Sequence, residues 1–311
     1  MVRRDEIMPA SLMALPHMVE HHSNLRGVLG YWIDSGFLPG ESIEGAHVLD
    51  FGAGGGSLGL LLLELGAASV TAVDPSLCED FYREHYASIP QIQYFTGVVQ
   101  NLTTASPDIR KTDFDLIISS SVTEHVLNLP EALRTIYALM KVDAVFFMAH
   151  DNHYHPSGHH DNFILRPDNN YIYKFAGPEC WDDASKCIVS GDFRGDLAKA
   201  TPWAWDASSN ASLSPDDCSC CPFYKRSKPW AHLLNVDTFA SVFPQPFFRE
   251  GLNKITPSML RHFIAEAGLH LELFHRHYAM NEVPEELLTE PHLYNPHDLK
   301  TLNIVARARK R

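Results

Sequence analysis

The sequence predicts an α/β protein built on a doubly wound, mostly parallel sheet of seven strands, with a large insertion after the fifth strand. Three observations support this fold class. Short apolar segments alternate with helical patterns of crossover length between residues 46 and 149. A glycine-rich turn follows the first of these segments. The alternation stops at residue 151 and resumes near residue 254.

The individual elements follow from local patterns. Apolar residues at helical spacing over 12–36 predict an N-terminal helix, and glycines at positions 66 and 268 end two later ones. Proline at position 257 suits the first turn of a helix, with the preceding threonine as its N-cap. The predicted strands are 46–51, 69–73, 91–96, 114–120, 142–149, 269–278 and 301–308. The predicted helices after the first are 57–66, 77–87, 130–141 and 257–267.

Length and composition limit the domain organisation and the class of partner. The chain has 311 residues, of which 45% are hydrophobic, so it can bury a substantial core. A net charge of −13 argues against nucleic acid as a partner. Neither a signal peptide nor an apolar run long enough for a bilayer is present, so we expect a soluble, cytoplasmic protein with no membrane partner. We expect a core of residues 1–150 and 254–311 and an inserted acceptor-binding cap of residues 151–253. The oligomeric state stays open.

The glycine-rich turn after the first predicted strand is the most informative motif. Its pattern is Asp-x-Gly-x-Gly-x-Gly, made by Asp50, Gly52, Gly54 and Gly56. Glycines let the backbone adopt positive φ and pass close to a ligand. Asp74 ends the next strand, where an acid can accept hydrogen bonds from a ribose diol. Strand, turn, helix and acid together predict a site for a nucleoside-containing cofactor.

Two classes of cofactor could bind at this turn, a dinucleotide or a cofactor that carries an ammonium group. A dinucleotide fingerprint requires glycine or alanine where this chain has Ser57, and an acid at Asp50 would repel a pyrophosphate. The same acid can hold an ammonium group, directly or through water. An NAD-dependent oxidoreductase is therefore the disfavoured interpretation.

Several segments resemble one known family. The run from Asp50 to Gly56 resembles motif I of the class I S-adenosylmethionine-dependent methyltransferases, and Asp74 is similar to their ribose-binding acid. Residues 114–126 resemble the fourth-strand segment of that family, including its frequent Glu-His-Val ending. The next helix ends in Lys-Val-Asp-Ala instead of the usual Lys-Pro-Gly-Gly. The resemblance covers residues 25–150 and 254–310 and excludes the predicted insertion.

The resemblance implies a methyltransferase that binds S-adenosylmethionine at the carboxyl ends of the strands. Asp74 would bind the ribose hydroxyls, and Gln100 or Asn101 would stand where the family often has an acid near the adenine amino group. The implied cofactor-binding residues are Asp50, Gly52, Ala53, Gly54, Asp74, Pro75, Gln100, Ser119 and Ser120.

Methyl transfer to a hydroxyl requires an aligned acceptor and a base that removes its proton. Histidine suits this role because its unperturbed pKa is about 6.5. His125 follows the fourth predicted strand and His153 follows the fifth, so both are predicted catalytic residues, with a structural role as the alternative for His125. We expect a small-molecule or glycan acceptor, methylated preferentially at oxygen. A catalytically inactive, S-adenosylmethionine-binding regulator or scaffold is the alternative function.

Two clusters of metal-capable side chains lie in the predicted insertion. Residues 153–161 are rich in histidine, and Asp151-Asn152 resembles the cation-binding pair of some small-molecule O-methyltransferases. Those enzymes also carry an acid after the fourth strand, where this chain has serines, so a polar acceptor-binding loop competes with a divalent metal site. Four thiolates with a turn between them could bind a structural zinc ion, although only the last two have the Cys-x-x-Cys spacing, and free thiols are the competing interpretation. These cysteines are Cys180, Cys187, Cys218 and Cys221.

Overall fold

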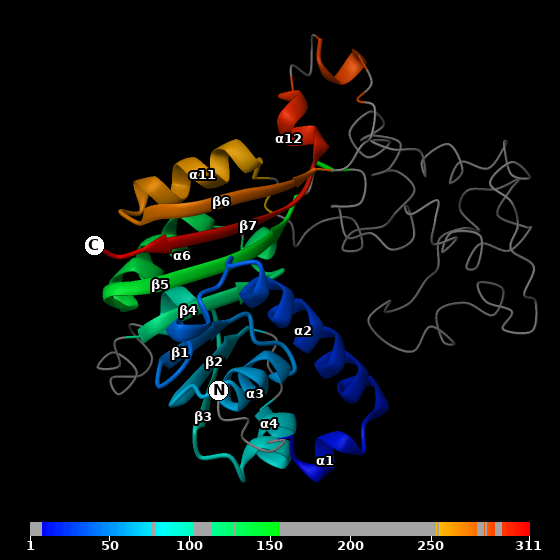
Figure 1. The fold of residues 1–311 in the computed structure, drawn as a ribbon, viewed down its shortest axis with the longest axis vertical. Coiled ribbons are helices and arrows are strands. Elements are labelled where there is room, and N and C mark those ends of the chain that lie inside the picture. Colours follow the sequence, from blue (N-terminus) through cyan, green and yellow to red (C-terminus); the bar gives the residue numbers. More distant parts are fainter. Residues whose placement is uncertain are drawn as a thin grey trace, which may run out of the picture. The chain divides into compact units, whose positions relative to one another are not determined.

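The computed structural model describes residues 8–75, 79–102, 114–126, 128–152, 154–155, 253, 255–278, 283, 285–289 and 294–311. The strands within these ranges are β1 (His47–Phe51), β2 (Ser69–Asp74), β3 (Ile92–Thr96), β4 (Phe114–Ser120), β5 (Met140–Asp151), β6 (His270–Tyr278) and β7 (Thr301–Arg309). They form one seven-stranded sheet in the order β3-β2-β1-β4-β5-β7-β6 (Figure 1). The first five strands pair in parallel, and β7 runs antiparallel to β5. The predicted fold class is confirmed.

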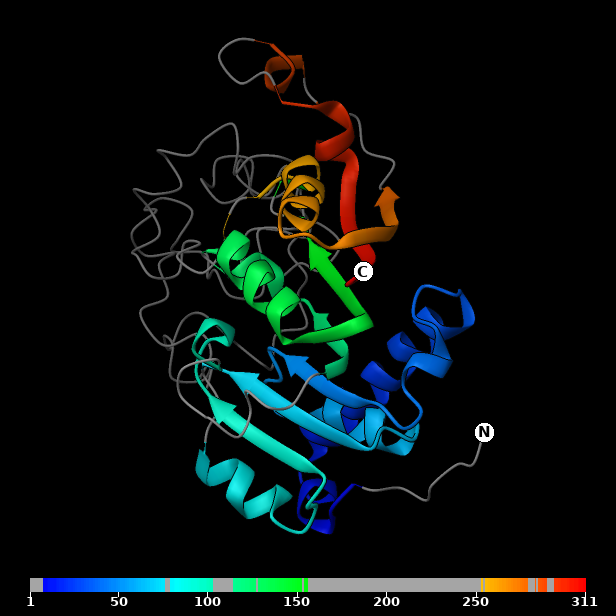
Figure 2. The same ribbon diagram turned by 90° about the vertical axis from the view of Figure 1, so that its left-hand side faces the viewer.

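Helices connect and cover these strands. The α-helices are α1 (Ala10–Met13), α2 (Pro16–Asp34), α3 (Ser57–Glu64), α4 (Glu79–Tyr86), α6 (Leu129–Leu139), α11 (Pro257–Glu266) and α12 (Pro296–Lys300). Short 3-10 turns occur at η1 (Gly40–Ser42), η2 (Val99–Asn101), η4 (Thr123–His125) and η9 (Glu285–Leu287). Helices α2 and α3 pack together, as do α6 and α11 (Figure 2).

The core forms because alternate residues of each central strand point to opposite faces of the sheet. On one face Val48 and Leu116 are fully buried in a cluster that includes Trp32, whose ring lies 4.9 Å from that of Phe147. Helix α3 is buried on every side, as its nearly continuous leucines predict. Its last residue, Glu64, accepts a 2.6 Å hydrogen bond from the Arg26 guanidinium and so links α3 to α2.

Two local predictions differ from the structure. The helix predicted over 12–36 is broken into α1 and α2, because Leu15 before Pro16 is extended, as residues preceding proline tend to be. Strand β5 begins at Met140, inside the helix predicted over 130–141. Its pairing with β4 shifts register there, and Asp143 takes a left-handed φ of +64° in the bulge. An aspartate tolerates this conformation better than most residues, and here it replaces the family's usual glycine.

The chain divides into two compact units, Met1–Asp151 with Pro257–His277 and Asn303–Arg311, and Asn152–Thr256 with Tyr278–Leu302. In the second unit the amide of Asn152 donates to the carbonyls of Asp298 and Thr301, both at 2.7 Å. Most of the predicted cap lies outside the described residues, so the boundaries of 151–253 stay a prediction. None of the described helices is long and apolar enough to span a membrane.

Candidate functional site

The predicted cofactor residues lie at one edge of the sheet because β1 to β4 are parallel. Asp50 in β1 is level with Ile118 in β4, so Ser119 and Ser120 follow toward the carboxyl end. Asp74 ends β2, and Gln100 lies in η2 shortly after β3. Ligands of open α/β sheets bind at such carboxyl ends. The fold therefore brings the predicted cofactor residues to the edge where a ligand is expected.

Three glycines give the turn between β1 and α3 its shape. The backbone angle φ is +84° at Gly52, +50° at Gly54 and +80° at Gly56, a region that favours glycine. A Cβ at Gly52 would overlap the side chain of Val122. A Cβ at Gly54, by contrast, would meet no described atom within 4 Å. The turn is therefore packed on the protein side and leaves room for a ligand next to Gly54.

Asp50 is a buried carboxylate at the base of this turn. It is 1% exposed, and its Oδ2 atom has no hydrogen-bond partner among the described residues. Burial first, and then the charge of Asp74, raises its pKa from 3.8 to about 7, although the backbone N–H of Gly59 opposes the shift. An under-satisfied buried carboxylate is unfavourable, and a cation placed beside it would relieve the penalty. The site thus fits a cofactor that carries positive charge.

Asp74 connects the ends of the first three strands. Its Oδ2 atom accepts a hydrogen bond from the backbone N–H of Gly54 at 3.0 Å, and its carbonyl accepts one from the N–H of Gly97 at 3.1 Å. A carboxylate has about four lone-pair positions, so it can hold the turn and still accept hydrogen bonds from a ribose diol. Pro75, which follows it, is exposed at the same edge.

The end of β4 supplies polar groups on the other side of the turn. Ser119 is fully buried, and its hydroxyl has no partner among the described residues. Ser120 is partly buried, and Ser121 takes a φ of +53° that turns the chain into η4. The predicted catalytic residue His125 ends η4 and is exposed, so its ring is accessible to solvent.

A buried cluster, whose side-chain contacts the sequence does not reveal, lies behind η4. His150 near the end of β5 is 1% exposed, and its Nδ1 atom shares a 2.9 Å hydrogen bond with the hydroxyl of Thr123. The same atom lies 3.8 Å from Oε2 of Glu124, which is also 1% exposed. Burial, followed by the charge of Asp151, raises the pKa of Glu124 well above its usual value. This cluster joins η4 to β5 and is too buried to contact a methyl acceptor.

The remaining predicted residues lie in other parts of the chain. His153 is outside the described residues, as are Cys180, Cys187, Cys218 and Cys221. The described residues contain no group of three or more His, Cys, Asp or Glu side chains arranged to hold a metal ion. Asn152 uses its side-chain carbonyl to accept a hydrogen bond from the N–H of Tyr154 at 3.2 Å. Its amide is thus engaged in the fold of the second unit.

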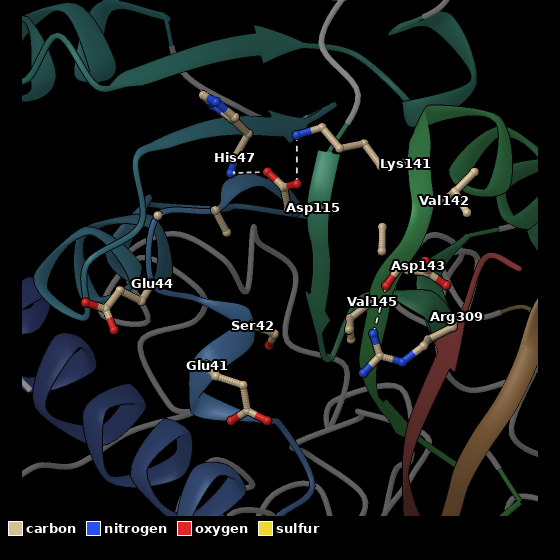
Figure 3. Close-up of a pocket in the computed structure, with 13 residues that line it drawn as sticks. Glu41, Ser42, Glu44, His47, Asp115, Lys141, Val142, Asp143, Val145 and Arg309 are labelled. Atoms are coloured by element: carbon tan, nitrogen blue, oxygen red, sulfur yellow. Dashed lines mark hydrogen bonds and ion pairs between the residues drawn. The ribbon is translucent and has the colours of Figure 1, made fainter.

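A described pocket of about 560 Å³ lies at the opposite, amino-terminal ends of β1 and β4 (Figure 3). Its cationic groups already have partners, since Lys141 Nζ lies 2.7 Å from Asp115 Oδ1, and Arg309 donates to the carbonyl of Asp143 at 2.8 Å. The lining residues are Glu41, Ser42, Glu44, Gly45, Ala46, His47, Asp115, Lys141, Val142, Asp143, Ala144, Val145 and Arg309. This pocket is separate from the glycine turn and its acids.

The order of the strands, the glycine turn and the acid Asp74 at the end of β2 together define a class of protein. A parallel sheet with one internal antiparallel strand, and a cationic-ligand site at the ends of β1 and β2, is the arrangement expected of class I S-adenosylmethionine-dependent methyltransferases. Residues 33–182 match the sequence model of a family described as a methyltransferase domain. The resemblance predicted from the sequence is confirmed, and this segment carries a methyltransferase domain.

Curated relatives match about a third of the chain. The mitochondrial ubiquinone biosynthesis O-methyltransferase of Bos taurus is 30% identical over 115 residues, which cover 35% of this chain and 30% of that protein. The ubiquinone biosynthesis O-methyltransferase of Methylobacterium nodulans is 30% identical over 110 residues, covering 34% and 41%. Ribosomal protein L11 methyltransferase of Listeria monocytogenes is 29% identical over 102 residues, covering 33% and 31%. The matches thus span about a third of the length of the curated relatives.

Structural comparison also matches this chain to two solved structures described as S-adenosylmethionine-dependent methyltransferases. The structure from Listeria monocytogenes has a TM-score of 0.42 at 13% identity and covers 91% of this chain and 99% of that one. The structure from Mesorhizobium loti has a TM-score of 0.41 at 16% identity and covers 88% and 94%.

Proposed function

We propose that this protein transfers the methyl group of S-adenosylmethionine to an oxygen atom of a small-molecule or glycan acceptor. The observation that carries the proposal is the pair of buried carboxylates, Asp50 and Asp74, beside a glycine turn with an open side at Gly54. S-adenosylmethionine is a cation with a ribose diol, and these two acids match both properties. When bound, it supplies an electrophilic methyl group.

Each cofactor-binding residue has a distinct proposed role. Asp50 would hold the ammonium group and Asp74 the ribose hydroxyls. The hydroxyl of Ser119, which has no partner among the described residues, would donate to the methionine carboxylate, with Ser120 beside it. The remaining groups follow from position: Gly52, Ala53 and Gly54 would lie along the methionine chain, and Pro75 and Gln100 would border the adenine.

Proton removal from the acceptor is proposed for His125 or His153. His125 is exposed at the end of η4, so it can exchange protons with an acceptor and with water. The neighbouring His150 is excluded from this role because it is buried against Thr123 and Glu124. We expect His153→Ala to reduce turnover more than it reduces affinity for S-adenosylmethionine.

The choice of oxygen rests on the named relatives. Seven of the relatives at 30–31% identity are ubiquinone biosynthesis O-methyltransferases, and they support a hydroxyl acceptor. A ribosomal protein L11 methyltransferase also matches, at 29% identity over 102 residues. Because relatives with different named acceptors match this chain to a similar extent, the acceptor is proposed to bind to the predicted insertion, residues 151–253.

The direct test is a search for a methylated product. The purified protein is incubated with S-adenosylmethionine and a metabolite extract, and the extract is compared by mass spectrometry before and after reaction. We expect a compound that gains one methylene unit in mass with the wild-type protein and not with Asp74→Ala. A wild-type protein that binds S-adenosylmethionine but methylates nothing in extracts from several sources would favour an inactive binding protein.

A further inference from the structure

We infer that Tyr82 and Tyr86 of α4 are positioning residues that hold the glycine turn in the shape that binds the cofactor. This inference rests on the proposed function, because the property it predicts is affinity for S-adenosylmethionine. Neither residue belongs to the glycine motif or to the strand ends, and α4 packs beside β3 (Figure 1).

The two tyrosines form a rigid unit. They lie four residues apart on α4, so their side chains share one face of the helix. Their rings stack with centroids 4.7 Å apart and planes inclined by 20°. Only 1% of Tyr82 and 2% of Tyr86 is exposed. Buried rings in van der Waals contact have few alternative rotamers, and their hydroxyl groups are thereby fixed in position.

Both hydroxyls donate hydrogen bonds to the glycine turn. Tyr82 Oη donates to the carbonyl of Gly54 at 3.2 Å, and Tyr86 Oη donates to the carbonyl of Gly55 at 2.5 Å. The N–H of Gly54 is held from the other side by Asp74 at 3.0 Å. Consecutive peptide groups of the turn are thus fixed by two side chains of α4 and one of β2.

The turn and the tyrosines also fit each other sterically. A Cβ at Gly56 would lie 2.8 Å from Tyr82 Oη and 2.7 Å from Tyr86 Oη, so the hydroxyls occupy the space that a side chain would need. Burial first, and the charge of Asp50 second, raises the pKa of both phenols above the ordinary value of 10.0. Both groups therefore remain protonated donors over the physiological pH range.

The hydroxyls distinguish positioning from simple core packing. Phenylalanine would fill the same volume, and a buried phenol without a partner would be unfavourable. The turn has three glycines with positive φ and is intrinsically free to adopt other shapes. Holding its carbonyls before the ligand arrives lowers the entropy lost on binding, which is the usual benefit of preorganisation.

The test uses Tyr82→Phe, Tyr86→Phe and the double variant in the 311-residue chain. The matched control is Tyr94→Phe on β3, whose ring lies 5.1 Å from that of Tyr82 in the same aromatic cluster and which is 37% exposed. Isothermal titration with S-adenosylmethionine should show roughly fivefold weaker binding for each single variant and at least about tenfold for the double variant. In steady-state assays the KM for S-adenosylmethionine should rise while kcat at saturation stays unchanged. The control should match the wild type.

Three outcomes would decide against the inference. A double variant that binds as tightly as the wild type would overturn it and leave the proposed function intact. Weaker binding that appears equally in Tyr94→Phe would show a general effect of the aromatic cluster and overturn the specific role. A wild-type protein that binds no S-adenosylmethionine would overturn the proposed function and this inference together. Thermal unfolding of each variant checks that the fold is retained, as expected for removal of a hydroxyl alone.

Discussion

The carboxylate of Asp50 couples the stability of the protein to its ligand. Its pKa is raised from 3.8 to about 7 in the folded protein, mainly by burial. Between these two pH values the folded state binds more protons than the unfolded state, so the free energy of unfolding falls as pH rises across that window. Above pH 7 the ionised, buried carboxylate destabilises the folded protein, and a bound cation would reduce this destabilisation.

Asp50→Asn should therefore stabilise the ligand-free protein while weakening cofactor binding. We expect the free energy of unfolding at pH 8 to rise by roughly 2–4 kcal/mol, because the amide keeps the shape and removes the buried charge. At pH 4 the same substitution should have little effect. Urea unfolding at both pH values measures this, and a loss of stability at pH 8 would contradict the assignment.

The affinity for S-adenosylmethionine should also depend on pH through Asp50. The cationic ligand favours the ionised carboxylate, so affinity should fall as pH drops below about 7. Isothermal titration should show binding about five- to tenfold weaker at pH 6 than at pH 7.5. The profile of Asp50→Asn should be flat over this range, and a flat wild-type profile would show that another group holds the cation.

Individual residues were predictable where a local motif specifies them. Asp50 and Asp74 follow from their positions at strand ends next to a glycine turn. Tyr82 and Tyr86 could not be found in this way, because their contacts depend on how α4 packs against segments distant in sequence. The local sequence indicates only that two tyrosines, four residues apart, share one face of the helix that follows Asp74.

At the scale of elements, substitutions in the turn between β1 and α3 distinguish effects on stability from effects on cofactor binding. Gly54→Ala places a methyl group in open space at a φ of +50°, so it should lose only about 1 kcal/mol of stability but bind S-adenosylmethionine at least tenfold more weakly. Gly52→Ala overlaps Val122 and should lose several times more stability.

The control for the turn is a glycine in a helix. A Cβ at Gly30 in α2 would meet no described atom within 4 Å outside its own helix, so Gly30→Ala should raise stability by about 1 kcal/mol and leave binding unchanged. Urea unfolding and isothermal titration on the three variants test both properties. Normal cofactor binding by Gly54→Ala would place the ligand elsewhere.

The pairing of strands β6 and β7 is stabilised by one acid that forms ion pairs with two arginines. Glu272 in β6 lies 3.1 Å from Arg307 Nε and 2.7 Å from Arg309 Nε in β7, and its side chain is 22% exposed. Glu272→Gln should lower the free energy of unfolding by about 1 kcal/mol at low ionic strength, and this loss should shrink at high salt, which screens the ion pairs of the wild type. Asp80→Asn, which breaks an exposed pair with Arg83, should change stability much less. Equal effects of the two substitutions would contradict a specific role for Glu272.

Element boundaries followed the sequence where periodicity was uninterrupted. The range of β4 agrees with the predicted 114–120 because a charged residue before it and a turn after it delimit an apolar run. The N-terminal helix and the start of β5 were misplaced. Leu15 is extended before a proline, and the bulge at Asp143 depends on the register between β4 and β5, which local sequence does not reveal.

At the scale of the whole molecule, the methyltransferase domain is the part that this chain shares with other methyltransferases. We propose that residues 151–253 determine which acceptor is methylated. Replacing 156–252 with a short glycine-serine linker should leave the affinity for S-adenosylmethionine within about threefold of the wild type, since the proposed cofactor contacts lie outside that segment. Methyl transfer to the native acceptor should be lost. A deletion variant that folds but no longer binds S-adenosylmethionine would show that the segment contributes to the cofactor site.

The most direct test of the central claim is isothermal titration of S-adenosylmethionine into the 311-residue chain at pH 7.5, with Asp74→Ala alongside. Asp74 holds Gly54 and is the proposed ligand of the ribose hydroxyls. We predict saturable binding of one molecule per chain to the wild type and at least tenfold weaker binding to the variant. Absence of binding to the wild type, or equal affinity in both proteins, would contradict the assignment of this sheet edge as the cofactor site.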